Sequence, residues 1–128
     1  MIRRIATALT AASAVVLLSA GVAQAADTRV YTQDLWGTYL GSATWTENGD
    51  SMEVCDTAAD GWGVRGYIYV PNAPFPEDGT VLIKGNDPSS DGKCAAFSKN
   101  ISETTALSIK VCIYRGSSVT YCEYRRIR

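Results

Sequence analysis

The chain contains no histidine among its 128 residues. Without histidine, neither a Ser–His nor a Cys–His nucleophile can be assembled, which excludes the commonest covalent hydrolase mechanisms. The chain also lacks an excess of basic residues, because 12 lysines and arginines stand against 13 acidic residues. It therefore has no electrostatic reason to bind nucleic acid or an anionic membrane.

Carboxylate catalysis finds little support either. A glycosidase-type acid pair needs one carboxyl group in an apolar pocket that raises its pKa. Within the apolar runs the acids are Glu53 and Glu123, and both occupy alternating strand positions where a solvent-facing acid is ordinary. We therefore expect a protein that is not an enzyme and uses no cofactor and no catalytic metal.

The first 25 residues are interpreted as a cleaved signal peptide. Arg3 and Arg4 supply the positive start, residues 5–22 form an Ala-rich apolar run, and Ala23-Gln24-Ala25 is a small-x-small cleavage site. A single-span anchor is the competing interpretation, but it would need ~20 strongly apolar residues and no processing site. Cleavage predicts a secreted, extracellular chain whose net charge falls from −1 to −3 with the loss of the two arginines.

The four cysteines are Cys55, Cys94, Cys112 and Cys122. An even number of cysteines in an exported chain predicts disulfides, and four cysteines allow three pairings. Cys112 and Cys122 flank the turn-like stretch 115–118, so a hairpin folded there would bring them opposite each other. The sequence therefore favours Cys112–Cys122, which leaves Cys55–Cys94, and each bridge would contribute about 2–4 kcal/mol.

The mature chain has the pattern of short strands between turn signals, and no segment of it has a sustained helical period. The segment 26–36 is expected to be an extended arm or an edge strand, and 37–128 to form one all-β domain, a small disulfide-stapled β-sandwich. The clearest alternation places Ile109 and Val111 on one face and Cys112 on the other, so the Cys112 bridge is expected outside the core. The expected strands are 38–46, 51–55, 64–70, 80–84, 94–98, 105–114 and 119–126.

Three sequence elements are distinctive: residues 55–61 (CDTAADG), residues 92–97 (GKCAAF), and the pair Val111-Cys112 that closes with Cys122. Together they resemble a family of small secreted β proteins with two disulfides from actinobacteria such as Streptomyces. The resemblance covers about residues 43–124 and departs from the family at the 71–79 insertion. Most members have no assigned activity, so the resemblance implies fold and export. In size and class the chain also looks like the connector subunit of actinobacterial umbrella toxin particles.

The loop after Cys55 carries two acids, Asp56 and Asp60, next to Gly61. Calcium binding is one interpretation, but Ca²⁺ requires six to eight oxygen ligands and the spacing fits no known calcium loop. The favoured interpretation is a turn, in which Asp56 caps its own loop and Gly61 takes a positive φ. The run Arg125-Arg126-Ile127-Arg128 is interpreted as a solvated strand end.

Aromatic side chains are the best candidates for a binding surface, because they offer large contact area at a small entropic cost. Trp62 lies between two glycines in a loop, which suits a contact better than a core. Tyr67 and Tyr69 share one strand face, and Trp36 ends the N-terminal segment. We expect these four residues to bind a partner, with most other aromatic residues in the core.

The leading hypothesis is a secreted, non-enzymatic binding or assembly module that contacts another secreted protein, and a toxin-particle connector is one form of it. In that form the segment 26–36 adds to a partner as a strand, and deleting residues 26–35 is expected to leave the fold intact. A second hypothesis is a proteinaceous inhibitor of an extracellular hydrolase that presents the proline-rich loop 71–79. A third is a carbohydrate-binding module that uses Trp62.

Overall fold

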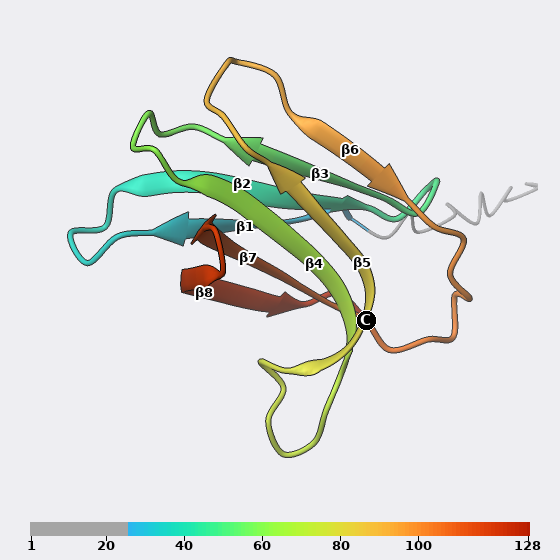
Figure 1. The fold of residues 1–128 in the computed structure, drawn as a ribbon. Helices are drawn as coiled ribbons and strands as arrows, with labels where there is room; N and C mark the ends of the chain where they lie inside the picture. Colours follow the sequence, from blue (N-terminus) through green and yellow to red (C-terminus); the bar gives the residue numbers. More distant parts are fainter. Residues whose placement is uncertain (1–25) are drawn as a thin grey trace, which may run out of the picture.

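The structure is a computed structural model that describes residues 26–128, so the signal-peptide prediction lies outside the described residues. Two four-stranded antiparallel sheets pack face to face (Figure 1). Within the described range the regular elements are all strands, which confirms the prediction of an all-β sandwich.

Each sheet combines strands from two parts of the chain. The first sheet has the order β1-β2-β3-β6 and the second the order β5-β4-β7-β8. The chain crosses between the sheets after β3, returns after β5 and crosses again after β6. The strands are β1 (Thr28–Gln33), β2 (Tyr39–Thr46), β3 (Ser51–Asp56), β4 (Gly63–Pro71), β5 (Gly79–Asp87), β6 (Ala95–Ser98), β7 (Ser108–Arg115) and β8 (Ser118–Arg126).

The N-terminal segment is built into the sandwich as an edge strand. In β1, the side chains of Val30 and Thr32 are buried. The hydroxyl group of Thr32 donates a hydrogen bond of 2.5 Å to the carbonyl oxygen of Tyr121 in β8, which joins the edges of the two sheets. This confirms the edge strand among the two expectations for the segment. Deleting residues 26–35 would remove the strand, so we now expect the deletion to destabilise the fold.

Strand β5 continues to Asp87, although the sequence predicted that this strand ends at residue 84. Two side chains at its end explain the extension. Asn86 accepts a hydrogen bond of 2.7 Å from Arg65 Nε, and Asp87 Oδ2 accepts one of 2.8 Å from the backbone N–H of Asp56. These polar contacts keep the end of β5 extended, although its residue types are typical of a turn.

The core lies between the two sheets and takes residues from both. Trp45 is 0% exposed, and its Nε1 donates a hydrogen bond of 2.6 Å to Glu47 Oε2, so its polar atom is satisfied. Gly66 in β4 leaves room for Met52 and Val54 of the opposite sheet, since a Cβ there would lie 2.7 Å from the nearest Val54 methyl. The core residues are Val30, Leu40, Ala43, Trp45, Met52, Val54, Val64, Ile68, Ile83, Ile101, Leu107, Ile109, Val111 and Ile113.

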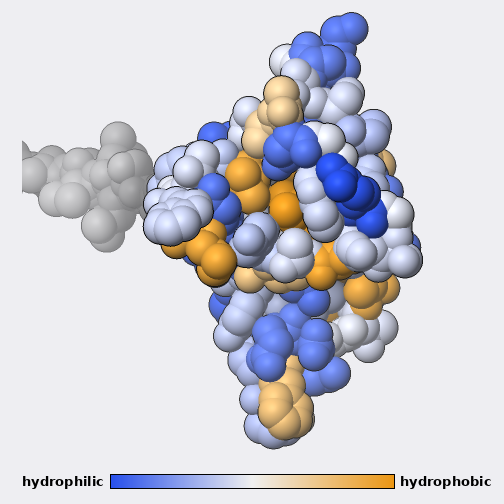
Figure 2. Space-filling model, turned by 60° about the vertical axis from the view of Figure 1, so that its left-hand side comes forward, coloured by the Kyte–Doolittle hydropathy of each residue, from blue (hydrophilic) through white to orange (hydrophobic). Residues whose placement is uncertain are grey.

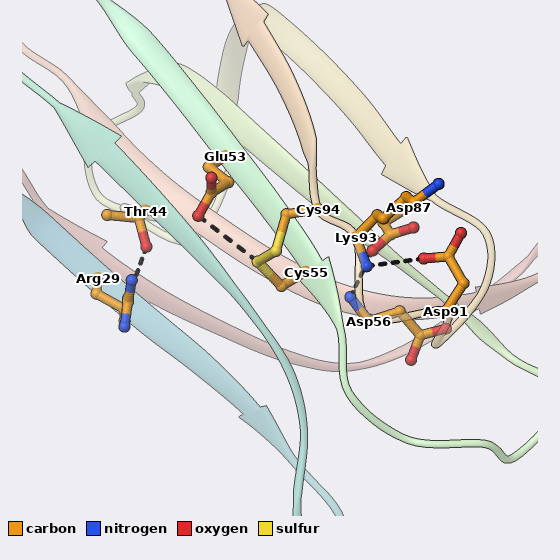
Figure 3. Close-up of a disulfide and its surroundings, with 9 residues drawn as sticks. All are labelled: Arg29, Thr44, Glu53, Cys55, Asp56, Asp87, Asp91, Lys93 and Cys94. Carbon is orange, nitrogen blue, oxygen red and sulfur yellow. Dashed lines mark hydrogen bonds between the residues drawn. A yellow bond between two sulfur atoms is a disulfide. The ribbon is translucent and has the colours of Figure 1, made fainter.

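Both predicted disulfides are present, Cys55–Cys94 and Cys112–Cys122. The first joins β3 to the residue before β6 (Figure 3), and the second joins β7 to β8. The Cys112 bridge was expected outside the core, but Cys112 itself is fully buried, opposite Arg65 of β4, whereas Cys122 is exposed. Each bridge fastens an edge strand to its neighbour within one sheet.

Arg128 corrects the expectation of a solvated chain end. Its guanidinium group forms an ion pair with Glu47, lies 3.7 Å from a carboxylate oxygen of Glu103, and donates 3.0 Å hydrogen bonds to the carbonyl oxygens of Ser102 and Thr105. Arg128 therefore ties the segment before β7 to the turn after β2.

Candidate functional site

The turn between β1 and β2, residues 34–38, forms what we call the hairpin tip. Asp34 Oδ1 accepts hydrogen bonds from the backbone N–H groups of Trp36 (2.8 Å) and Thr38 (2.9 Å). Both bonds lower the pKa of the Asp34 carboxyl group, and the bond from Thr38 has the larger effect. Gly37 has a φ of +79°, a conformation that suits glycine. The hairpin tip is therefore ordered by its own hydrogen bonds.

The hairpin tip displays two large apolar side chains. Trp36 is 91% exposed and Leu35 is 84% exposed. Beside them, Tyr31 and Tyr39 are also exposed, and their ring centroids lie 4.7 Å apart. Because burying apolar area is favourable, by about 25 cal/mol per Å², such a group of exposed side chains is a candidate surface for association.

The loop between β3 and β4 has the turn structure that the sequence favoured. Asp56 Oδ1 accepts a hydrogen bond of 3.1 Å from Ala58 N–H, Asp60 Oδ1 accepts one of 2.9 Å from Trp62 N–H, and Gly61 has a φ of +75°. Burial raises the pKa of Asp56, and the carboxylates of Asp60, Asp87 and Asp91 raise it further.

Trp62 is half-buried and packs against the core, which corrects the expectation that it stands apart from it. The guanidinium group of Arg115 lies over its ring. Gly63 packs tightly against the ring of Tyr114, because a Cβ at position 63 would lie 2.5 Å from a ring carbon. This contact helps to fix where the loop enters β4.

A hollow of about 420 Å³ lies at this end of the sandwich, next to the hairpin tip. Three segments that are distant in sequence form it: the β1–β2 hairpin, the β3–β4 loop that carries Trp62, and the strands β7 and β8. In the view of this end in Figure 2, hydrophobic residues gather near the centre and hydrophilic residues surround them. The lining residues are Asp34, Leu40, Asp60, Trp62, Ile113, Thr120 and Tyr121.

One wall of the hollow depends on a bulge in β8. Val111 pairs with Glu123 and Ile113 with Thr120, so two residues of β8 lie opposite Cys112. Tyr121 is one of them and has a φ of +49°, which is uncommon for a residue other than glycine. The bulge directs Tyr121 against the core and into the lining of the hollow.

Tyr67 and Tyr69 do not form the open aromatic strip that the sequence predicted. Tyr69 is 1% exposed, because the loop 71–79 folds back over it and the carbonyl oxygen of Pro76 accepts a hydrogen bond of 2.8 Å from its hydroxyl group. This burial raises the pKa of the Tyr69 hydroxyl group. Tyr67 is half-buried, with Lys110 Nζ 5.2 Å from its ring centroid.

The loop 71–79 is itself ordered and exposes Phe75. Asn72 N–H donates a hydrogen bond of 2.8 Å to the carbonyl oxygen of Asp78, and Lys110 Nζ donates one of 3.0 Å to that of Glu77. Phe75 is 62% exposed. In Figure 1 this loop projects below the sandwich, away from the hairpin tip on the left.

Within residues 26–128, one group of three possible metal ligands lies close together: Glu53, Cys55 and Cys94. Both cysteines belong to the disulfide, so neither offers the thiolate that binds a metal. Glu53 Oε1 lies 3.7 Å from Cys55 Sγ (Figure 3), a van der Waals contact because a disulfide sulfur has no hydrogen to donate.

Comparison with family models, with curated proteins and with solved structures found no match for this chain. In the part of the chain that the structure describes, no helix has the length and apolar character to span a membrane. The function is therefore inferred from the surface of the molecule itself.

Proposed function

We propose that this protein is a secreted, non-enzymatic module that binds another extracellular protein through its hairpin tip. The observation that supports the proposal most is the 91% exposure of Trp36 on a turn that Asp34 holds rigid. Tryptophan is enriched among residues that dominate binding energy, and an ordered turn loses little entropy on binding. The two disulfides suit an extracellular compartment.

The test compares two variants that each remove an exposed aromatic side chain from a turn, Trp36→Ala and Phe75→Ala. The immobilised mature protein is exposed to culture supernatant of the producing organism, and retained proteins are quantified by mass spectrometry. A specific partner should be retained by the wild type and by Phe75→Ala. Trp36→Ala should bind it about thirtyfold more weakly, which corresponds to ~2 kcal/mol, with an unchanged melting temperature.

Three results would count against the proposal. Equal retention by wild type and Trp36→Ala would show that the hairpin tip is not the contact. Dimerisation of the pure protein through Trp36, measured by sedimentation, would assign the surface to a second copy. Flotation of the protein with lipid vesicles, lost in Trp36→Ala, would assign it to a membrane.

The connector version of this function needs a second contact surface, and Phe75 provides a candidate. The ordered loop 71–79 presents it away from the hairpin tip. A connector should bind two partners, one lost in Trp36→Ala and the other lost in Phe75→Ala. A ternary complex that survives both substitutions would contradict this version.

Inhibition of an extracellular hydrolase is the second candidate function, and the same loop favours it. A rigid, exposed loop suits an inhibitor because little entropy is lost on binding, and Tyr69 and Lys110 hold this loop through Pro76 and Glu77. A panel of proteases and amylases tests it. Inhibition that Phe75→Ala abolishes and Trp36→Ala retains would favour the inhibitor, and inhibition of no enzyme would eliminate it.

A further inference from the structure

The hollow beside the hairpin tip combines apolar walls with two carboxylates. Asp34 begins the hairpin tip and also lines the hollow, so the two features adjoin each other. We propose that the hollow receives a lysine or arginine side chain of the protein that binds the hairpin tip. This inference rests on the proposed function and specifies the chemistry of the partner.

The walls fit the aliphatic part of a long basic side chain. Leu40 and Ile113 are buried core residues that reach the hollow, and the rings of Trp62 and Tyr121 complete the walls. Lysine and arginine place their methylene groups on apolar surface while their charged ends stay near polar groups. The aromatic rings also attract a cation that lies over their faces.

The two carboxylates have capacity left for a cation. Asp34 Oδ1 accepts two backbone N–H groups, and Asp60 Oδ1 accepts the N–H of Trp62. Within the described range Asp60 accepts this one hydrogen bond, and the Thr38 side chain also contacts the Asp34 carboxylate, so Asp60 has the larger remaining capacity. The ion pairs of residues 26–128 involve Asp78, Glu47 and Glu103 instead.

Arg115, which contacts Trp62, does not fill the hollow. Arg115 stacks on Trp62, with its Cζ 5.0 Å from the ring centroid, and its Nε lies 3.4 Å from the carbonyl oxygen of Gly61. It does not belong to the lining of the hollow, whose charged groups are both carboxylates. The lining therefore favours a cation over an anion or a neutral ligand.

The experiment titrates the ¹⁵N-labelled mature protein with N-acetyl-lysine methylamide and follows the Trp62 indole N–H resonance. The matched ligand is N-acetyl-norleucine methylamide, which has a similar aliphatic chain and no charge. The matched variants are Asp60→Asn and Asp91→Asn. Both asparagines can still accept the loop hydrogen bond that the aspartate accepts, from Trp62 N–H and Lys93 N–H respectively, and Asp91 does not line the hollow.

The lysine derivative should shift the resonances of Trp62 and Tyr121 saturably, and the norleucine derivative should bind more weakly. Asp60→Asn should weaken binding of the lysine derivative about two- to fivefold, as expected for one partly exposed charge pair. Asp91→Asn should leave its affinity unchanged. Equal binding of both derivatives, equal effects of both variants, or stronger binding of a neutral sugar such as N-acetylglucosamine would overturn the inference.

The small ligands test the hollow without the partner, so the two proposals can fail separately. Charge-selective binding with equal partner retention by Trp36→Ala would refute the hairpin-tip function and leave the hollow as a site for a basic side chain. Partner loss in Trp36→Ala without charge selectivity would refute the inference about the hollow alone.

Discussion

The guanidinium carbon of Arg115 lies 5.0 Å from the centroid of the Trp62 ring. Arg115 is the last residue of β7 and Trp62 lies in the β3–β4 loop, so this contact joins two segments at the same end of the sandwich. A cation over an aromatic ring contributes about 0.5–1 kcal/mol at an exposed site.

Arg115→Gln should loosen Trp62 without unfolding the sandwich. We expect a loss of about 0.5–1 kcal/mol in the free energy of unfolding and easier quenching of tryptophan fluorescence by acrylamide. Trp36 is exposed and contributes a constant background, so the measurement is made in a Trp36→Phe protein. Quenching that does not change would show that Arg115 does not hold Trp62 in place.

Asp56 should make stability depend on pH. Burial raises its pKa above the ordinary value of 3.8, so the folded protein retains a proton that the unfolded chain has released. Its contribution therefore favours folding at low pH and is lost as the pH rises through the pKa of the folded state. Asp56→Asn should raise the free energy of unfolding at neutral pH, and this gain should shrink toward zero as the pH falls below 3.8.

Urea unfolding from pH 2 to pH 8 measures this difference, with Asp27→Asn in the exposed segment before β1 as the control. An Asp56→Asn protein that is less stable than the wild type at pH 7 would contradict the prediction. It would mean that the carboxylate, and not an amide, is needed for the hydrogen bond to Ala58 N–H.

Arg128 should stabilise the fold through its contacts with Glu47, Ser102 and Thr105. Arg128→Ala removes hydrogen bonds of a charged group that is largely buried, so we expect a loss of about 1–3 kcal/mol. Arg125, exposed in β8, is the control, and Arg125→Ala should change the stability by less than ~0.5 kcal/mol. Equal effects of the two substitutions would show that the contacts of Arg128 do not stabilise the fold.

Gly85 and Phe97 should be energetically coupled. A Cβ at Gly85 would lie 2.2 Å from the ring of Phe97, so Gly85→Ala should destabilise the protein by about 1–3 kcal/mol through overpacking. In a Phe97→Ala background the added methyl group has space and should cost little. Chemical denaturation of the two single variants and the double variant measures the coupling, and additive effects would show that the ring moves aside freely.

The fold is predictable from the sequence because the signals that specify it are local. Alternation in β7 identifies a half-buried strand, and the turn at residues 115–118 is enough to place Cys112 opposite Cys122. The same local signals locate most strand ends to within a few residues. The predicted extent of β5 is too short, since the last residues of this strand are held by Arg65 and by the backbone of Asp56, which are distant in sequence.

The candidate site is less predictable, because it depends on how distant segments meet. Alternation correctly puts Tyr67 and Tyr69 on one face, but it cannot show that the loop 71–79 folds back over Tyr69. The sequence does not identify Tyr121 as a site residue, because no sequence pattern indicates the bulge that turns this side chain into the hollow. Leu35 could have been predicted as an exposed residue, because Asp34 and Gly37 are typical of a tight turn that would display it.

The two disulfides share a position that determines how the protein should respond to reduction. Cys94 precedes β6 and Cys122 lies in β8, and these strands are the outer borders of the two sheets. Neither bridge crosses the sandwich, so reduction would leave the core continuous while allowing a border strand to peel away. Exposed strand borders pair readily with other chains. Loss of the bridges should therefore lead to aggregation and proteolytic nicking at β6 and β8 before the protein unfolds as a whole.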